Sequence, residues 1–193
     1  MAEETINNSF QNKISIILKK NFKRIIFFII ILILILFSYF FYKDVQNKNE
    51  IKISQNFTKA SIQLKENKKS EAKQLLENII NEDHRFYSPL ALYFIIDNSL
   101  EADPLKVINF FDRILAINSI DEENLNLIKI KKVIFLFNTG DEKTIIKILN
   151  PIINSDSVWR NMAINLISDY FLSKDQKTKA NEYIQLLSNK IKK

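Results

Sequence analysis

The chain has 193 residues, 47% of them hydrophobic, and a formal net charge of +6. Residues 1–24 carry five Lys/Arg against two Asp/Glu and residues 43–193 carry 23 against 20, so each part contributes +3 and the basic character does not predict nucleic-acid binding. With no cysteine the chain has no disulfides, thiolate nucleophiles or thiolate metal ligands.

Residues 1–24 are predicted to form a cytoplasmic tail that ends in a short amphipathic helix over Lys13–Arg24. Its apolar positions follow helical spacing, with basic residues mostly on the other face. They are Ile14, Ile17, Leu18 and Phe22. Two interpretations are open: the helix lies on an anionic membrane surface, or it extends the following apolar helix outward.

The stretch from Ile25 to Tyr42 (IIFFIIILILILFSYFFY) has eighteen residues and no charge, proline or glycine. As a helix it reaches about 27 Å, close to the hydrocarbon thickness of a bilayer. A buried core helix would show a polar face, and a cleaved signal peptide would end at small residues rather than at the aromatic run before Lys43. The stretch is therefore interpreted as an uncleaved transmembrane anchor, with the lipid bilayer as a partner.

The basic residues predict the orientation of this anchor. Five of them stand within twelve positions before it, whereas Lys43, Lys48 and Lys52 after it are diluted by Asp44 and Glu50. Because positive residues favour the cytoplasmic side, we expect a cytoplasmic N-terminus and a domain outside the cytoplasm.

Residues 43–193 are predicted to form one all-helical domain, since the chain has one glycine and three prolines and shows helical periodicity throughout. We expect four pairs of helices. Ser70, Asp103 and Asp141 are expected near helix starts, Pro89 and Pro104 at first helical positions, and Gly140 as a left-handed residue after a helix. The predicted segments are 51–66 and 71–81, then 89–96 and 103–115, then 122–138 and 141–154, then 157–172 and 175–190.

The second helices of the pairs repeat one another. Ala72, Val107, Ile145 and Ala180 occupy one equivalent position, at intervals of 35, 38 and 35 residues. Four residues on come Leu76, Phe111, Leu149 and Ile184, and three further on come Ile79, Ile114, Ile152 and Leu187. A period near 34 with two helices per unit indicates a tetratricopeptide-like α-solenoid of about four helix pairs.

The layout resembles a known family, the ancillary subunit of the bacterial Sec translocon. An amphipathic N-terminal segment, one anchor and a helical array follow one another, and the stretch FYSPLA at residues 86–91 is similar to the family's entry into its second helix pair. The resemblance covers almost the whole chain. It implies a single-pass protein of the bacterial inner membrane with a tetratricopeptide-like periplasmic domain, and as partners the Sec translocon, periplasmic chaperones or exported clients.

We find no pattern that predicts an enzyme. His84 is the only histidine and has only Glu82 and Asp83 beside it, so it is interpreted as a solvated loop side chain rather than a metal ligand. A single glycine excludes the glycine-rich phosphate-binding motifs. We therefore expect no cofactor, no metal, no nucleic acid and no small-molecule substrate.

What remains is a binding surface for proteins, which paired-helix arrays present on their concave side. Trp159, Tyr93 and Tyr170 are the candidate partner-binding residues, and Trp159 stands out because it follows the link at residues 151–157. The sequence predicts a membrane-anchored interaction scaffold that assists Sec-dependent translocation or hands exported proteins to chaperones. The alternative is a scaffold of the same fold in envelope biogenesis or cell division.

Overall fold

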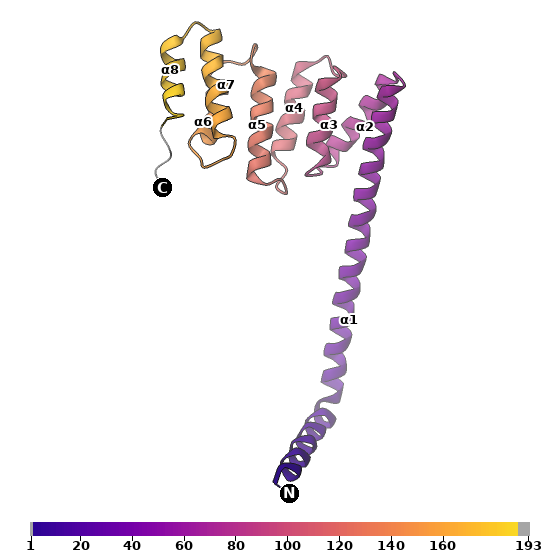
Figure 1. Cartoon of the computed structure of the whole chain (residues 1–193). Coiled ribbons are helices and arrows are strands. Elements are labelled where there is room, and N and C mark those ends of the chain that lie inside the picture. The colour runs from indigo at the N-terminus through magenta and orange to yellow at the C-terminus, as the bar shows by residue number, and fades with distance from the viewer. Residues whose placement is uncertain (1, 189–193) are drawn as a thin grey trace. The chain divides into compact units, whose positions relative to one another are not determined.

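The computed structural model describes the backbone of residues 2–188 and the side chains of residues 23–24 and 26–188; every regular element in this range is a helix (Figure 1). The helices are α1 (Ala2–Lys65), α2 (Lys69–Asn81), α3 (Tyr87–Asp97), α4 (Pro104–Leu115), α5 (Glu122–Leu136), α6 (Glu142–Ile153), α7 (Arg160–Ser173) and α8 (Lys177–Gln185). The predicted all-α class is confirmed. The amphipathic face predicted before Lys23 lies outside the described side chains.

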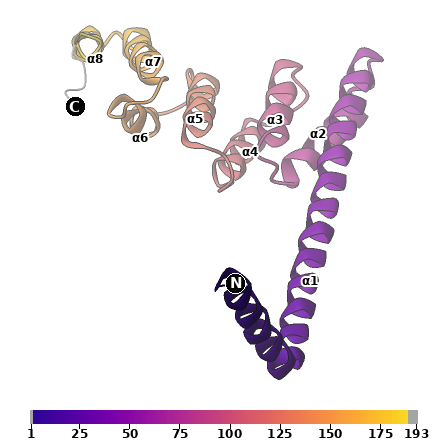
Figure 2. The same cartoon turned by 60° about the horizontal axis from the view of Figure 1, so that its bottom comes forward.

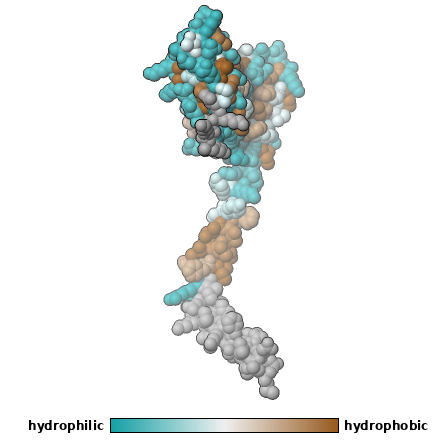
Figure 3. Space-filling model, turned by 60° about the vertical axis from the view of Figure 1, so that its left-hand side comes forward, coloured by the Kyte–Doolittle hydropathy of each residue, from teal (hydrophilic) through white to brown (hydrophobic). Residues whose placement is uncertain are grey.

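Helix α1 runs without interruption from Ala2 to Lys65. The predicted anchor and the predicted first helix of the array are therefore one helix, because residues 2–65 contain no glycine or proline to break it. All side chains of residues 26–52 are exposed, and Figure 3 shows the apolar ones as a brown band on the visible face of the helix. This N-terminal helix is long and apolar enough to span a membrane.

The chain divides into two compact units, residues 1–52 and residues 53–193. In the second unit each helix from α2 to α7 contacts the next one along the chain. Figure 2 shows α3, α5 and α7 in one row, with α4 and α6 in a second row beside it. From α3 to α7, successive helices thus alternate between two rows.

The buried side chains of the domain form two clusters. The first joins the end of α1 with α2, α3, α4 and one face of α5, and Leu76, Phe111 and Ile114 are fully buried in it. The second joins the other face of α5 with α6, α7 and α8, around Ile145 and Leu149. Each helix of the domain contributes one apolar stripe, as the periodicity of the sequence predicts; α5 contributes two.

Aspartates begin three of the helices, and the sequence predicted a helix start at each of them. The Asp103 carboxylate accepts from the backbone N–H of Leu105 at 2.9 Å, with Pro104 as the first residue of α4. The Asp141 carboxylate accepts from the backbone N–H of Thr144 at 3.0 Å and caps α6. Asp121 caps α5 in the same way. Each cap satisfies a donor that the first helical turn leaves open.

Two predicted helix starts were wrong. Ser70 does not cap α2, which begins at Lys69 after Lys68 and has no side-chain cap. Pro89 is the third rather than the first residue of α3, which begins at Tyr87. Proline fits both positions, because none of the first N–H groups of a helix has a partner within that helix.

Gly140 was also predicted wrongly, since its φ is not positive. A Cβ at this position would lie 2.9 Å from the backbone oxygen of Leu136, so close approach rather than a left-handed conformation requires the glycine. Among the described residues the left-handed positions are Asn67, Asp83, Ser99 and Asp175. Asn and Asp tolerate this conformation better than other residues with a side chain.

The equivalent positions of the proposed repeat are buried in the first three pairs. Leu76, Phe111 and Leu149 have no exposed surface, whereas Ile184 in α8 is 42% exposed. Leu187, the last member of the next equivalent set, is 37% exposed. Burial at these two equivalent positions therefore does not extend to α8.

Candidate partner-binding face

Five of the nine exposed large apolar side chains among residues 53–188 lie on α5 and α7 or just before α3 and α7. They are Phe86, Ile134, Val158, Met162 and Leu172. We call the surface that they form with the half-buried Leu90, Tyr93, Leu127 and Lys131 the odd-helix face. Ile134 is 49% exposed and Val158 78% exposed, so this apolar surface is open to a partner.

The outward sides of α2, α4 and α6 are different in character. Their exposed residues are mainly charged or amide side chains, with Leu105 as an exception. They include Glu71, Gln74, Asn78, Asn109, Asp112, Arg113, Lys143 and Lys147. Helices α2, α4 and α6 therefore expose fewer large apolar side chains than the odd-helix face does, and the odd-helix face is the candidate site for a protein partner.

Tyr93 lies at the junction of α3 and α5 on the odd-helix face. Its ring is half-buried, and the Lys131 ammonium of α5 stands 4.4 Å from the ring centroid. Burial raises the pKa of the Tyr93 hydroxyl to about 12, so the hydroxyl stays protonated at physiological pH. This pair places an aromatic ring and a cation beside each other among apolar neighbours, a combination that anchors partners at many interfaces.

Trp159 and Tyr170, the other two predicted partner-binding residues, lie in the second cluster. Trp159 directly precedes α7; its side chain is half-buried against that cluster, and its backbone N–H donates to Ser157 Oγ at 3.2 Å. Tyr170 is only 3% exposed, and its hydroxyl donates to the backbone oxygen of Gly140 at 3.1 Å. Tyr170 thus fastens α7 to the α5–α6 link, and of the three residues Tyr93 is the one on the odd-helix face.

Sequence reasoning did not single out Lys131, Ile134 or Met162. The signal for the first two was present, because Leu127, Lys131 and Ile134 follow helical spacing on the side of α5 opposite its buried residues. This spacing alone did not identify the outward side, because α5 contributes buried side chains to both clusters and has apolar residues on several sides.

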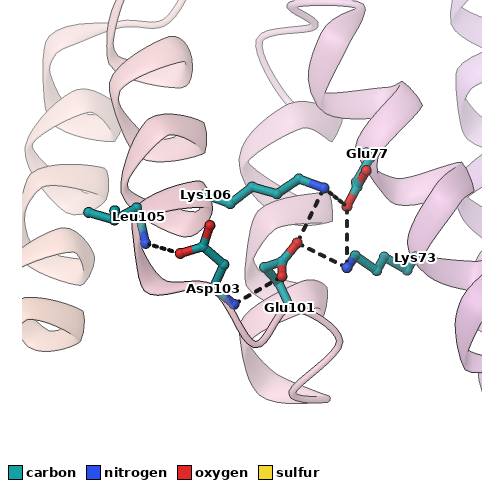
Figure 4. A network of polar contacts seen from close by, with 6 residues as sticks. All are labelled: Lys73, Glu77, Glu101, Asp103, Leu105 and Lys106. Carbon is teal, nitrogen blue, oxygen red and sulfur yellow. Dashed lines mark hydrogen bonds and ion pairs between the residues drawn. The ribbon is translucent and has the colours of Figure 1, made fainter.

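A network of four charged side chains holds α2, α4 and the loop between α3 and α4 together (Figure 4). Glu101 Oε2 lies 2.9 Å from Lys73 Nζ and 3.2 Å from Lys106 Nζ. Lys106 Nζ also lies 2.8 Å from Glu77 Oε1. The alternation of signs lets each charge face an opposite one, so the network fixes the positions of these elements.

Glu101 is the centre of the network. Its side chain is 7% exposed, and its Oε1 accepts from the backbone N–H of Asp103 at 3.0 Å. The Asp103 N–H, followed by the Lys73 ammonium, lowers the pKa of Glu101 to about 2. The carboxylate is therefore ionised under physiological conditions and supports the first two helix pairs.

His84 was predicted to be a solvated loop side chain, but the structure places it differently. It is half-buried, and its Nδ1 accepts from the backbone N–H groups of Phe86 and Tyr87 at 3.2 and 3.1 Å, at the start of α3. Within the part of the chain that the structure describes, no three His, Asp or Glu side chains are grouped so that they could hold a metal ion. The geometry of His84 is that of a helix cap.

Comparison with known proteins gives no relative: no family model, no curated protein and no solved structure matches this chain.

Proposed function

We propose that this protein is a membrane-anchored scaffold for protein–protein interaction, in which α1 is the anchor and the odd-helix face binds the partner. The observation that supports the proposal most strongly is that Ile134, Val158, Met162 and Leu172 are exposed on or just before α5 and α7, whereas α2, α4 and α6 expose one large apolar side chain, Leu105. Soluble domains rarely expose contiguous apolar surface without a binding role. Anchoring to a membrane raises the local concentration of partners there, so the intrinsic affinity can be modest.

The helical domain is proposed to be a tetratricopeptide-like array. The alternation of helices between two rows and the burial of equivalent positions in successive pairs support this geometry. In such an array one layer lines a continuous binding surface, and we assign this role to α3, α5 and α7.

The specific partner proposed is the Sec translocon or a polypeptide leaving it, with hand-over to periplasmic chaperones. This assignment is based on the resemblance in layout and on the positive residues before the anchor, which favour a domain outside the cytoplasm. An exported polypeptide that has not yet folded exposes apolar side chains, which the odd-helix face can cover.

Site-specific photocrosslinking in intact bacteria tests the proposal. A photoreactive amino acid replaces Ile134 on the odd-helix face, and the control replaces Lys147 on the outward side of α6. We expect translocon subunits, exported proteins or chaperones to crosslink from position 134 and not from position 147. Crosslinks from 134 to division or envelope-assembly proteins would move the role to that alternative, and crosslinks from neither position would refute the binding face.

A double substitution tests whether the crosslinks depend on the apolar side chains of the odd-helix face. Ile134→Glu with Met162→Glu places two carboxylates on the odd-helix face, where both side chains are at least 44% exposed. We expect crosslinking from Tyr93 to fall at least tenfold while the helical content stays unchanged, since neither side chain is part of the core. Lys143→Glu with Lys147→Glu on α6 is the matched control and should leave crosslinking unchanged.

A further inference from the structure

The two buried clusters meet at α5, and the two faces of this helix differ. The face in the second cluster carries Ile130, Val133 and Leu136, all buried, and one turn earlier the buried Asn126, whose amide donates to Ser157 Oγ at 3.3 Å. On the face toward the first cluster, Ile128 and Phe135 are separated by a lysine, Lys132. The packing of α5 against α4 is therefore interrupted by a charge, whereas its face in the second cluster includes a neutral amide but no buried charge.

Lys132 is 7% exposed, and its Nζ lies 2.5 Å from Asp112 Oδ1 on α4. The Asp112 side chain is 60% exposed, so the buried lysine reaches its partner at the edge of the domain. Between Ile128 and Phe135 the side of α5 that faces α4 therefore ends in an ion pair at the edge of the interface instead of in apolar contact. Buried ion pairs stabilise less than well-packed apolar side chains of the same volume.

Polar contacts tie the helices within each half of the domain. In the first half Arg113 of α4 donates to both carboxylate oxygens of Asp83, at 2.8 and 2.9 Å, and Lys106 joins the network around Glu101. In the second half Lys179 of α8 lies 2.6 Å from Glu142 of α6. These contacts link α2 with α4 and α6 with α8.

Between the halves, the contacts come from neighbouring side chains of α5. Lys132 reaches Asp112 on α4, and Lys131 lies over the Tyr93 ring on α3. Phe135 packs against both clusters, with its ring 6.1 Å from that of Phe111, and Ile108 of α4 reaches the second cluster. Fewer polar contacts cross this boundary than lie within the second half, where Ser157 Oγ also donates to Glu123, Ser168 Oγ to the Ala180 carbonyl and the Tyr170 hydroxyl to the Gly140 carbonyl.

We propose that the interface of α4 with α5 is a hinge at which the two halves of the helical domain rotate against each other, with Lys132 of α5 permitting the motion and the contact of Lys131 with Tyr93 limiting it. Helix α5 moves with α6, α7 and α8. Because the hinge crosses the odd-helix face between Tyr93 and Lys131, rotation changes the curvature of that face and fits it to partners of different shape.

Distances between spin labels test the hinge, and the absence of cysteine in the chain makes labelling simple. Cysteines at Asn78 on α2 and Lys147 on α6 span the hinge. Two control pairs lie within one half each: Asn78 with Asn109 on α4, and Lys147 with Asn181 on α8. All four sites are exposed and lie off the odd-helix face. The full chain is labelled in detergent micelles, and double electron–electron resonance gives the distance distributions.

We expect the pair across the hinge to give a distribution at least twice as wide as either control pair. Equal widths would overturn the hinge. In the Lys132→Leu variant, which makes the α4–α5 interface apolar throughout, we expect the wide distribution to narrow to the width of the controls. A wide distribution that Lys132→Leu leaves unchanged would overturn the role assigned to this lysine. Far-ultraviolet circular dichroism of each variant confirms that the helices are intact.

The experiment is independent of the partner-binding proposal. A hinge without any crosslink from the odd-helix face would leave the motion standing and remove the binding role. Crosslinks from the odd-helix face together with equal distance widths for all three pairs would leave the binding role standing and remove the hinge.

Discussion

The apolar stretch of α1 and the core of the helical domain are built from the same types of apolar side chain. In the apolar stretch these side chains are exposed, and in the core they are buried. Residues 26–42 are exposed throughout, whereas Leu76, Phe111 and Leu149 have no exposed surface. The difference lies in spacing. Helices α2 to α8 alternate apolar and polar residues so that one side can be buried, and residues 26–42 contain no charge at all. Composition alone would not separate the two regions.

The largest expected effect contrasts one substitution in the two regions. Phe111→Ala removes a fully buried ring and should lower the free energy of unfolding of the domain by about 3–5 kcal/mol. Phe40→Ala removes a ring that is 66% exposed and should leave the unfolding of the domain unchanged. Urea unfolding of the full chain in detergent micelles, followed by circular dichroism, measures both. Similar losses for the two variants would contradict the division into an exposed span and a buried core.

An intermediate effect concerns the charge network of the first two helix pairs. Glu101→Gln should lower the free energy of unfolding by about 1–2 kcal/mol at pH 7, since it leaves Lys73 and Lys106 without the shared carboxylate. The lysines are partly open to solvent, which limits the loss. Lys143→Gln on the outward side of α6 is the control, and it should change the stability by less than about 0.5 kcal/mol.

The same carboxylate makes stability depend on pH. Because the pKa of Glu101 is lowered from 4.5 to about 2 in the folded protein, its contribution is complete above pH 4.5 and disappears as the pH falls toward 2. The Glu101→Gln variant should lack this part of the acid dependence. Unfolding measured between pH 6 and pH 2.5 checks it; parallel curves for the two proteins would show that the Glu101 carboxylate is not held in this way.

The smallest effect separates a true helix cap from an apparent one. Asp141→Ala removes the acceptor for the Thr144 N–H and should lower the free energy of unfolding by about 1 kcal/mol. Ser70→Ala should cost less than about 0.3 kcal/mol, because Ser70 lies inside α2 and does not cap it. Thermal unfolding of the two variants side by side distinguishes them, and a larger loss for Ser70→Ala would contradict the observed start of α2.

The order of the helices could be predicted from the sequence because apolar periodicity dictates it. Helix ends were harder to predict. At three links the chain turns in a left-handed conformation that glycine more often adopts, but the residues there are Asn67, Asp83 and Ser99. The single glycine, Gly140, is required instead because a side chain at this position would lie too close to Leu136. Where several residues near a helix start could cap it, as in the link before α2, the backbone path decides and the sequence does not reveal that path.

The candidate face was predicted less well than the fold. Helical spacing makes Tyr93 and Tyr170 look alike, yet one lies on an outward side and the other is 3% exposed. Which side of a helix faces out depends on the neighbours that the fold brings to it. The network around Glu101 joins residues of α2, α4 and the loop before α4, and a single sequence carries no sign of such pairing.

The central claim is that a membrane anchor holds the helical domain outside the cytoplasm. Cysteine labelling in intact bacterial cells tests this claim most directly. One variant carries a cysteine at Gln74 in α2, and the other carries it at Ser9, before the anchor. The account predicts that a maleimide unable to cross the inner membrane labels position 74 in intact cells and labels position 9 only after lysis. It also predicts that both variants are recovered at full length in the membrane fraction. Recovery of either protein in the soluble fraction, or labelling of position 74 only after lysis, would contradict it.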